Sequence, residues 1–436
     1  MRILLVSTYE LGHQPLHLAS PAASLRDKGH EVRMVDLSLG ADTLDAGDAD
    51  GVAYSVPMHT ALRLAIASAH RVREVWPSLP IAFYGLYAGM GGEDLAVAQL
   101  VGEYETALVE WAGALTPRAG TDIGQKRFLV PDRSGLSPLT SYARLAGRGQ
   151  ERVAGYVEAS HGCRHRCRHC PIPAVYDGRY RITGLETVTA DVGQLVAMGA
   201  EHITFGDPDF LNAPRYSLDV LRAVHKSHPT LSFDVTVKVS HILDHQGLWP
   251  ELAGLGVVMV VSAFETTNNR ILAILDKGHT AQQMAEAVAV VRSAGIEIRP
   301  SWMPFTPWTE PGDLSDILEF LARHELLDAI DPVQLSIRLL VPKGSLLADR
   351  PEMGEYDSEL LTYRWLSPRP EEDKLQAKVA QLAEAGAGVH PLDTLRSIWE
   401  LVIDRPFPRP SDRDPLRLTE PWFCCAEPTS RQLANL

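Results

Sequence analysis

The stretch that decides the fold is CRHRCRHC at residues 163–170, which holds three of the five cysteines of this 436-residue chain. Cys163, Cys167 and Cys170 have the spacing C-x3-C-x2-C. Three thiolates this close together suit a [4Fe-4S] cluster, and a cluster held by three sulfurs keeps one iron open to an outside ligand. An open iron indicates catalysis rather than simple electron storage.

A zinc loop is the alternative interpretation of these residues. Structural zinc takes four ligands in a closed tetrahedral set. His165 and His169 lie inside the same short loop, where geometry makes it hard for either to complete a tetrahedron with all three sulfurs. A disulfide is less favoured, because five cysteines in a long chain without a signal peptide are typical of a reduced, cytoplasmic protein. We therefore favour the cluster.

The cysteine spacing resembles the cluster loop of radical S-adenosylmethionine (SAM) enzymes, in which the amino and carboxylate groups of SAM chelate the fourth iron. The segment FGDPD at residues 205–209 stands where that family has its Gly-Gly-Glu-like segment, and SAFETTN at 262–268 resembles a segment of the cobalamin-type branch. The resemblance covers roughly residues 150–345. It implies the following SAM-binding residues: His169, Gly206, Asp207, Asp209, Lys238, Glu265 and Arg299.

Strand-like and helix-like patterns alternate along most of the chain, which predicts an α/β fold. Near the N-terminus, apolar runs at 1–12, 29–36, 50–56 and 80–85 alternate with helical patterns at 20–28 and 62–75, as in a doubly wound parallel sheet. From residue 155, six predicted strands suggest a partial (β/α)6 barrel, in which the chemistry lies at the carboxyl ends of the strands. These strands cover 155–160, 202–206, 232–239, 257–263, 297–303 and 333–339.

The predicted domains are residues 1–110, a connector at 111–150, the partial barrel at 151–345, and a mostly helical C-terminal region at 346–436 with a cysteine-bearing tail. The first domain resembles the cobalamin-binding Rossmann domain of one radical SAM branch. It lacks the D-x-H-x-x-G cobalt-ligating motif, although His13 and His17 follow the first strand. We therefore expect this domain to bind no cobalamin.

Charge and hydropathy exclude two classes of partner. The formal net charge of −14 argues against a general nucleic-acid binder, which needs a basic face. No apolar run approaches the roughly 20 residues that cross a bilayer. We expect a cytoplasmic enzyme with neither nucleic-acid nor membrane partners.

The tail carries a second cysteine site, Cys424-Cys425-Ala426-Glu427-Pro428. Adjacent cysteines rarely form a disulfide with each other, and soft thiolates select soft acceptors, among which is trivalent arsenic. The alternative is a pair of buried small hydrophobes. This segment resembles the signature of the CUAEP/CCAEP-tail radical SAM (seleno)proteins, in which the position of Cys425 is often selenocysteine. That family resembles the one containing the radical SAM enzyme of arsinothricin biosynthesis.

The resemblance implies transfer of the 3-amino-3-carboxypropyl group of SAM to arsenic, giving hydroxyarsinothricin. It makes Cys424 and Cys425 the catalytic thiols that hold As(III), SAM and arsenite the substrates, and flavodoxin or ferredoxin the reductant protein. Two alternatives stay open. One is a 5′-deoxyadenosyl-radical enzyme that modifies a peptide or small metabolite, and the other is a non-catalytic metal or metalloid sensor.

Overall fold

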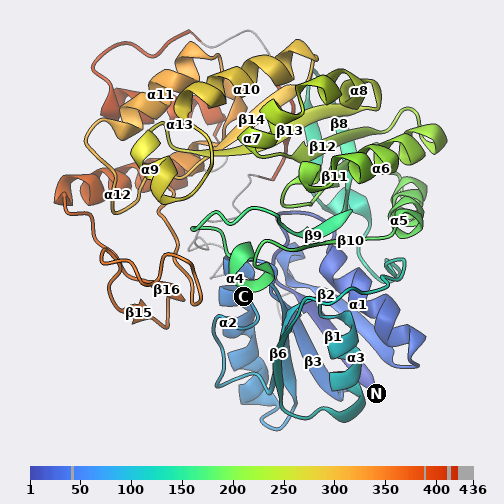
Figure 1. Cartoon of the computed structure of the whole chain (residues 1–436). Coiled ribbons are helices and arrows are strands. Elements are labelled where there is room, and N and C mark those ends of the chain that lie inside the picture. The colour runs from blue at the N-terminus through green and yellow to red at the C-terminus, as the bar shows by residue number, and fades with distance from the viewer. Residues whose placement is uncertain (41–43, 387–388, 410–413, 421–436) are drawn as a thin grey trace.

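The computed structural model of the chain describes residues 1–40, 44–386, 389–409 and 414–420. Two α/β units lie against each other, with the N-terminal unit below the barrel unit in Figure 1. The predicted tail site, Cys424, Cys425 and Glu427, lies outside the described residues.

The N-terminal unit is a six-stranded sheet in the order β2-β1-β3-β4-β5-β6, and all its neighbouring strands are parallel. Its strands are β1 (Arg2–Ser7), β2 (Glu31–Asp36), β3 (Gly51–Ser55), β4 (Ile81–Gly85), β5 (Ala98–Gly102) and β6 (Arg118–Asp122). Because strand side chains alternate between faces, Leu4 and Val6 pack under α2 (His59–Val75). Ile3 and Leu5 pack under α1 (Leu16–Asp27) and α3 (Glu105–Ala114). The predicted doubly wound sheet is confirmed.

Strand β6 lies within residues 111–150, for which the sequence predicts only a connector. The strand joins the sheet edge beside β5. Its sequence, RAGTD, is almost entirely exposed, so it carries no apolar pattern that would have marked it as a strand.

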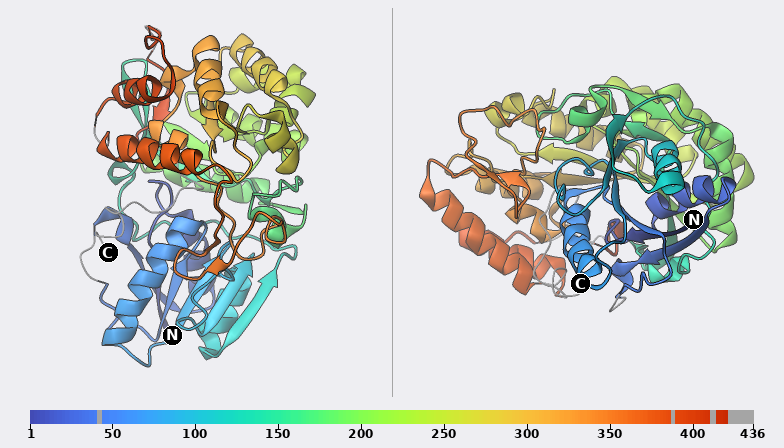
Figure 2. Two further views of the ribbon diagram at one scale, coloured as in Figure 1. Left: turned by 90° about the vertical axis from the view of Figure 1, so that its left-hand side faces the viewer. Right: turned by 90° about the horizontal axis from the view of Figure 1, so that it is seen from below.

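The barrel unit is a seven-stranded curled sheet in the order β14-β13-β12-β11-β8-β7-β17. Five strands run parallel, β8 (Gln150–Val157), β11 (His202–Phe205), β12 (Ser232–Thr236), β13 (Val257–Glu265) and β14 (Glu297–Trp302). Two antiparallel strands, β7 (Arg144–Gly147) and β17 (Arg417–Leu418), extend the β8 edge. The helices between these strands are α5 (Leu185–Ala197), α6 (Pro214–Ser227), α7 (Val239–Asp244), α8 (Trp249–Gly254), α9 (Asn269–Ile274), α10 (Ala281–Ser293) and α11 (Asp313–Arg323). Figure 2 shows the helices arranged around the sheet.

The predicted sixth barrel strand at 333–339 is wrong. The segment begins as a 3-10 helix, Pro332–Ser336, and touches the barrel edge through a single parallel bridge between Phe305 and Arg338. The alternation Val-Gln-Leu-Ser-Ile imitates a strand. Proline has no N–H for a ladder but fits the first turn of a helix, and Pro332 occupies that turn.

The C-terminal region supplies a small hairpin, β15 (Tyr356–Asp357) and β16 (Thr362–Tyr363), and two helices, α12 (Pro370–Ala385) and α13 (Pro391–Val402). Both helices pack into the barrel core, through Val379 and Trp399 among others. The hairpin loop reaches the other unit, where Leu361 joins the core of the N-terminal sheet. This segment therefore ties the two units together, as the left view of Figure 2 shows.

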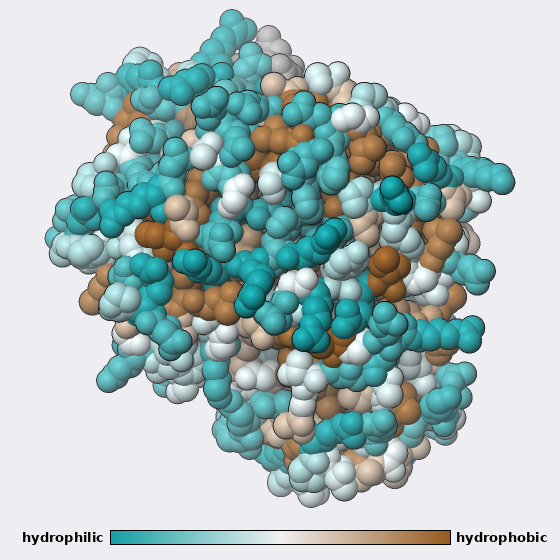
Figure 3. Space-filling view, viewed as in Figure 1, coloured by the Kyte–Doolittle hydropathy of each residue, from teal (hydrophilic) through white to brown (hydrophobic). Residues whose placement is uncertain are grey.

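The face shown in Figure 3 is mostly hydrophilic, with apolar residues in scattered patches. Within the described residues, none of the helices combines the length and apolarity that a membrane span requires.

Candidate active site

A cavity of about 370 Å³ lies between the two units. One wall comes from loops that follow β1, β3, β4 and β5, with Glu10, His17 and Tyr104 among its residues. The other wall comes from loops that follow the parallel barrel strands. Both sheets thus turn their carboxyl-terminal edges, where α/β folds bind ligands, toward one space.

The cysteine loop is held at this cavity by a short hairpin. Strand β9 (Ser160–Gly162) pairs antiparallel with β10 (Tyr180–Ile182), and the loop between them contains the helix α4 (Ile172–Tyr176). Gly162 has φ +76°, and a Cβ there would lie 2.7 Å from the ring of Tyr176. Only glycine fits this turn, so Gly162 sets the direction in which the loop leaves the strand.

The three thiols of the loop share a wall of the cavity and form no disulfide. Cys163 and Cys167 are buried and Cys170 is half-buried. Burial raises the pKa of the Cys163 thiol to about 11, and iron binding would displace that proton. Three thiols on one wall fit a [4Fe-4S] cluster with one iron open to the cavity.

A buried charge cluster stands behind the thiols. Glu265, the last residue of β13, receives a hydrogen bond from Nζ of Lys277 (3.0 Å) on Oε1, and Nε2 of His169 lies 3.1 Å from the same oxygen. Burial alone would raise the pKa of Glu265, but Lys277 and His169 outweigh it and hold that pKa well below its usual range. Burial likewise disfavours the Lys277 ammonium. Glu265, followed by the thiols of Cys167 and Cys170, nevertheless raises the Lys277 pKa.

Glu265 also has a strained backbone, with φ +66°. A non-glycine residue in this region is uncommon, and such strain concentrates at functional sites. A register shift in the pairing of β13 with β14 falls at the same point, between Ala263 and Glu265. The strand end is therefore bent at the residue whose carboxylate faces the cysteine loop.

The segment after β11 forms the next part of the wall. Oδ2 of Asp207 accepts a hydrogen bond from the amide of Ala159 (2.9 Å), and its Oδ1 accepts one from the hydroxyl of Ser160 (2.6 Å). Burial raises the pKa of Asp207 to about 7. Gly206 leaves room for the ring of Tyr156, which a Cβ would overlap.

The structure brings together most of the residues predicted from the sequence. The cavity is lined by Cys163, Cys167, Cys170, His169, Gly206, Asp207, Asp209, Lys238 and Glu265. Arg299 is the exception. It lies in the first half of β14 and donates to Asp331 (3.0 Å) and to the carbonyl of Leu416 (3.4 Å), so it serves a structural ion pair instead of the cavity.

Sequence reasoning missed a network of acids and histidines between the units. Glu158 lies between Nε2 of His17 (3.6 Å) and Nε2 of His161 (3.3 Å). Nδ1 of His17 contacts Glu10 at 3.0 Å, and Nδ1 of His161 contacts Glu103 at 2.9 Å. Burial would lower both histidine pKa values, but the carboxylates raise that of His17 to about 9 and that of His161 to about 10. Both imidazoles are therefore charged at neutral pH.

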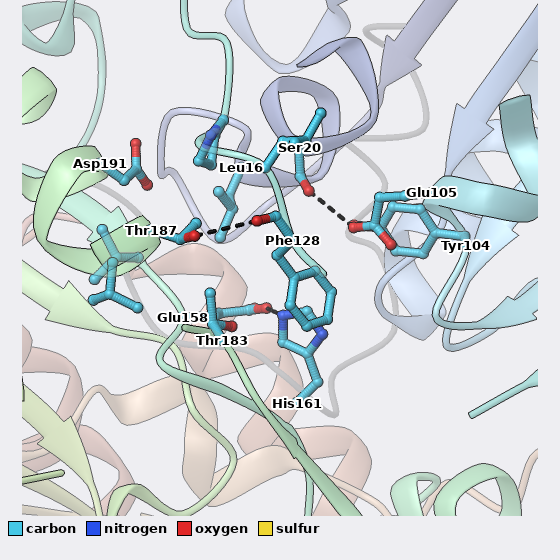
Figure 4. A pocket seen from close by; sticks show the side chains of 14 residues that line it. Leu16, Ser20, Tyr104, Glu105, Phe128, Glu158, His161, Thr183, Thr187 and Asp191 are labelled. Atoms are coloured by element: carbon cyan, nitrogen blue, oxygen red, sulfur yellow. Dashed lines mark hydrogen bonds and ion pairs between the residues drawn. The ribbon is translucent and has the colours of Figure 1, made fainter. Parts of the chain in front are cut away.

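One residue could have revealed this network from the sequence. Glu103 directly follows the strand AQLVG, but that strand was not predicted. Figure 4 shows the neighbouring small cavity of about 30 Å³, with Glu158 and His161 on one side and Glu105 on the other. Ser20 donates a hydrogen bond to Glu105 Oε1 at 2.8 Å. A space of this size holds about one water molecule, so the larger cavity is the candidate active site.

The two histidines that follow β1 differ in how well they suit imidazole ligation of cobalt. His17 is protonated and faces carboxylates on both ring nitrogens. His13 is buried and stacks on Tyr156 with ring centroids 4.8 Å apart, and burial lowers its pKa to about 4. A metal needs a free nitrogen lone pair, which the charged ring of His17 lacks and which the neutral ring of His13, in the cavity wall, retains.

Comparison with known proteins agrees with this architecture. Residues 157–321 match the family model described as the radical SAM superfamily. The chain is similar in structure to the cobalamin-dependent SAM radical enzyme OxsB with aqua-cobalamin and SAM bound, with TM-score 0.63 and 13% identity, covering 93% of this chain and 73% of that one. It is also similar to the radical SAM methyltransferase TsrM from Kitasatospora setae with tryptophan and a SAM analogue bound, with TM-score 0.54 and 18% identity, covering 76% of this chain and 72% of that one.

A curated relative is the ribosomal protein uS12 methylthiotransferase RimO of Pseudothermotoga lettingae, 24% identical over 224 residues, or 49% of this chain. The match spans about half the length of that relative (50%).

The match and the cysteine geometry define a radical SAM domain at residues 157–321. The chain therefore contains a segment that matches the radical SAM superfamily, and its fold is like that of OxsB and TsrM; the match implies a [4Fe-4S] cluster and SAM. OxsB binds cobalamin, which counts weakly against our prediction that this chain binds none. At such low identity the likeness shows the fold alone, so that prediction stays a prediction.

Proposed function

We propose that this radical SAM enzyme transfers the 3-amino-3-carboxypropyl group of SAM to trivalent arsenic, forming the arsenic-carbon bond of hydroxyarsinothricin. The tail motif Cys424-Cys425-Ala426-Glu427-Pro428 motivates the choice of acceptor, because adjacent thiolates suit a soft, small ion. The observation that supports the proposal is the position of Glu420, the last described residue before that tail.

Glu420 is anchored at the rim of the cavity. The hydroxyl of Tyr9 donates a hydrogen bond to its Oε1 at 3.0 Å, and the next residues, Glu10 and Leu11, line the cavity. Cys424 is the fourth residue after Glu420, and four residues of chain span at most about 14 Å. This short tether from a residue hydrogen-bonded to Tyr9 supports the proposal that both tail thiols act near the wall formed by Glu10 and Leu11.

The residues of the chain have separate roles in this proposal. When bound, the cluster supplies the electron that cleaves a carbon-sulfur bond of SAM. Lys277 offsets the charge of the thiolates at Cys167 and Cys170, and Glu265 holds Lys277 in place. Cys424 and Cys425 hold arsenic beside the reacting carbon, so that proximity is their main contribution. Methylthioadenosine leaves as the carbon-arsenic bond forms, and the electron that arsenic releases in passing from the trivalent to the pentavalent state balances the one that cleaved the carbon-sulfur bond.

The experiment that tests the proposal incubates enzyme, reductant, SAM and arsenite without oxygen and separates nucleosides and arsenic species by chromatography with mass detection. We expect methylthioadenosine in amounts that match a carbon-arsenic product. Cys424→Ser and Cys425→Ser should keep their iron but lose that product, because serine lacks the soft, readily ionised sulfur. Thr429→Ala, in the same tail but outside the motif, is the matched control. Product formation by both serine variants at the wild-type rate would remove the thiols from the mechanism.

The likeness to RimO favours a second candidate, a 5′-deoxyadenosyl-radical enzyme that modifies a peptide or small metabolite. The same assay separates the two candidates. If 5′-deoxyadenosine is the only nucleoside formed, the second candidate replaces the first. Iron and sulfide analysis of the reconstituted protein tests the remaining alternative, a non-catalytic sensor, which needs no redox-active cluster.

A further inference from the structure

Two histidines and an aspartate meet beside the cysteine loop, at the ends of three successive parallel strands. His165 lies in the loop itself. Asp209 follows β11 and caps the 3-10 helix Phe210–Asn212, and His241 lies in α7 after β12. Each offers one ligand atom, and these atoms all lie within 4.8 Å of one another. We propose that His165, Asp209 and His241 bind a divalent transition-metal ion such as zinc, separate from the iron-sulfur cluster.

Two polar atoms of this triad, one on Asp209 and one on His241, have no hydrogen-bond partner among the described residues. The side chain of Asp209 is 2% exposed. Its Oδ1 accepts a hydrogen bond from the Leu211 amide at 3.0 Å, which leaves Oδ2 free. Oδ2 lies 2.8 Å from Nδ1 of His241 and 3.5 Å from Nε2 of His165. Neither contact is aligned as a hydrogen bond, so among the described residues Oδ2 and Nδ1 are both buried without a hydrogen-bond partner.

A buried carboxylate oxygen without a hydrogen-bond partner is destabilising. Nε2 of His165 and Nε2 of His241 lie 3.2 Å apart, and two protonated rings at that distance would repel each other. A dication satisfies the carboxylate and both imidazoles without that repulsion.

The donor set and spacing fit a zinc-type ion. Ligand atoms about 2.1 Å from one tetrahedral ion lie about 3.4 Å apart, close to the distances found here, and His241 can offer either ring nitrogen. Two imidazoles and one carboxylate are borderline donors that suit zinc, cobalt and ferrous iron better than magnesium or calcium. Three protein ligands leave a coordination position open. Since His165 and Asp209 line the cavity, a substrate oxygen or nitrogen can take that position.

The site is tied to the cysteine loop but does not depend on the arsenic proposal. The amide of Arg164 donates to Oδ1 of Asn212 at 3.1 Å, which fixes the loop against the segment that carries Asp209. The metal ligands lie on described elements, whereas the arsenic ligands of the proposed function belong to the tail. Failure of either proposal therefore leaves the other standing.

The test uses the full chain with its cluster reconstituted anaerobically, so that the thiols are already occupied. Zinc is added, loosely bound metal is removed by gel filtration, and zinc per chain is measured by mass spectrometry. X-ray absorption at the zinc edge then identifies the ligands. We expect one zinc per chain with nitrogen and oxygen ligands only. Absence of stoichiometric zinc, or a zinc with sulfur ligands, would overturn the proposal.

Variants locate the ion. Asp209→Asn and His241→Gln should weaken zinc binding at least about 10- to 100-fold while keeping the full iron content. His245→Gln is the matched control, because the ring centroids of His245 and His241 lie 5.6 Å apart but His245 is outside the triad, and this variant should bind zinc like wild type. Equal zinc affinity in all three variants and wild type would also overturn the proposal. The ligand identities in wild type decide the question even if a variant fails to fold.

Discussion

Replacing Lys277 with methionine tests whether the buried charge cluster behind the cysteine loop is energetically coupled. Lys277 and Glu265 are 5% and 10% exposed and lie 3.0 Å apart. Removing one partner of a buried ion pair costs roughly 3–5 kcal/mol, because the other charge stays buried without compensation. His169 still contacts Glu265 at 3.1 Å, so we expect a loss near the lower end, about 3 kcal/mol of unfolding free energy.

The double variant Lys277→Met/Glu265→Gln removes both charges and should be more stable than Lys277→Met alone. The expected coupling energy is about 2 kcal/mol. The assay is urea unfolding at pH 7 of anaerobically reconstituted protein, followed by far-UV circular dichroism. A loss below about 1 kcal/mol in the Lys277→Met variant, or losses that simply add in the double variant, would refute the coupling.

Three further predictions concern other parts of the site. Cys163→Ala should lose the cluster, measured as iron and sulfide per chain, and retain its far-UV circular dichroism, whereas full iron content would show that this thiol is no ligand. The pKa of His161 rises from an unfolded value near 6.5 to about 10, so its stabilisation is complete below about pH 6.5 and is lost as the pH rises toward 10. The melting temperature of wild type should therefore fall more between pH 7 and 10 than that of His161→Gln, and parallel curves would contradict this. Gly206→Ala should destabilise the protein by roughly 2 kcal/mol in chemical unfolding, because its Cβ overlaps Tyr156; Gly193→Ala, which meets no atom within 4 Å, is the control and should not.

The fold could be predicted from the sequence wherever a buried strand or helix has a clear pattern of apolar residues. Strands β3 and β4 are wholly buried and appear as continuous apolar runs, as central parallel strands do. Strand β6 was not predicted, because an exposed edge strand needs no apolar residues. The segment 333–339 was wrongly predicted as a strand, because alternating apolar and polar residues on a partly buried surface occur both in strands and in short 3-10 turns. Only its bridge to Phe305 is strand-like.

The residues of the candidate site were also predictable only where the sequence pattern indicates their place in the fold. Asp207 and Glu265 could be predicted because their segments, FGDPD and SAFETTN, resemble family segments at the carboxyl ends of barrel strands, where ligand-binding residues gather. Lys277 was missed as a site residue because it reaches the cavity from the turn after α9, where its amide bonds back to the carbonyl of Leu272 at 3.0 Å. Arg299 was misassigned because a charged residue within a strand gives no sign of which neighbour its side chain will meet.

The connector explains why the cavity is preformed. Arg133 is buried, and its guanidinium makes two hydrogen bonds to Asp191 of α5 at 2.7 and 2.8 Å. The same group donates to Gln14 in the N-terminal unit at 2.9 Å and to the carbonyl of Tyr156 on β8 at 2.8 Å. Domains joined by modest interfaces ordinarily move against each other. A buried, fully bonded arginine that holds both units opposes that motion, so the two strand-end edges face each other before substrate enters. In the proposed radical reaction, cavity walls that are already in position would orient the acceptor, so that no ordering cost is incurred during the reaction.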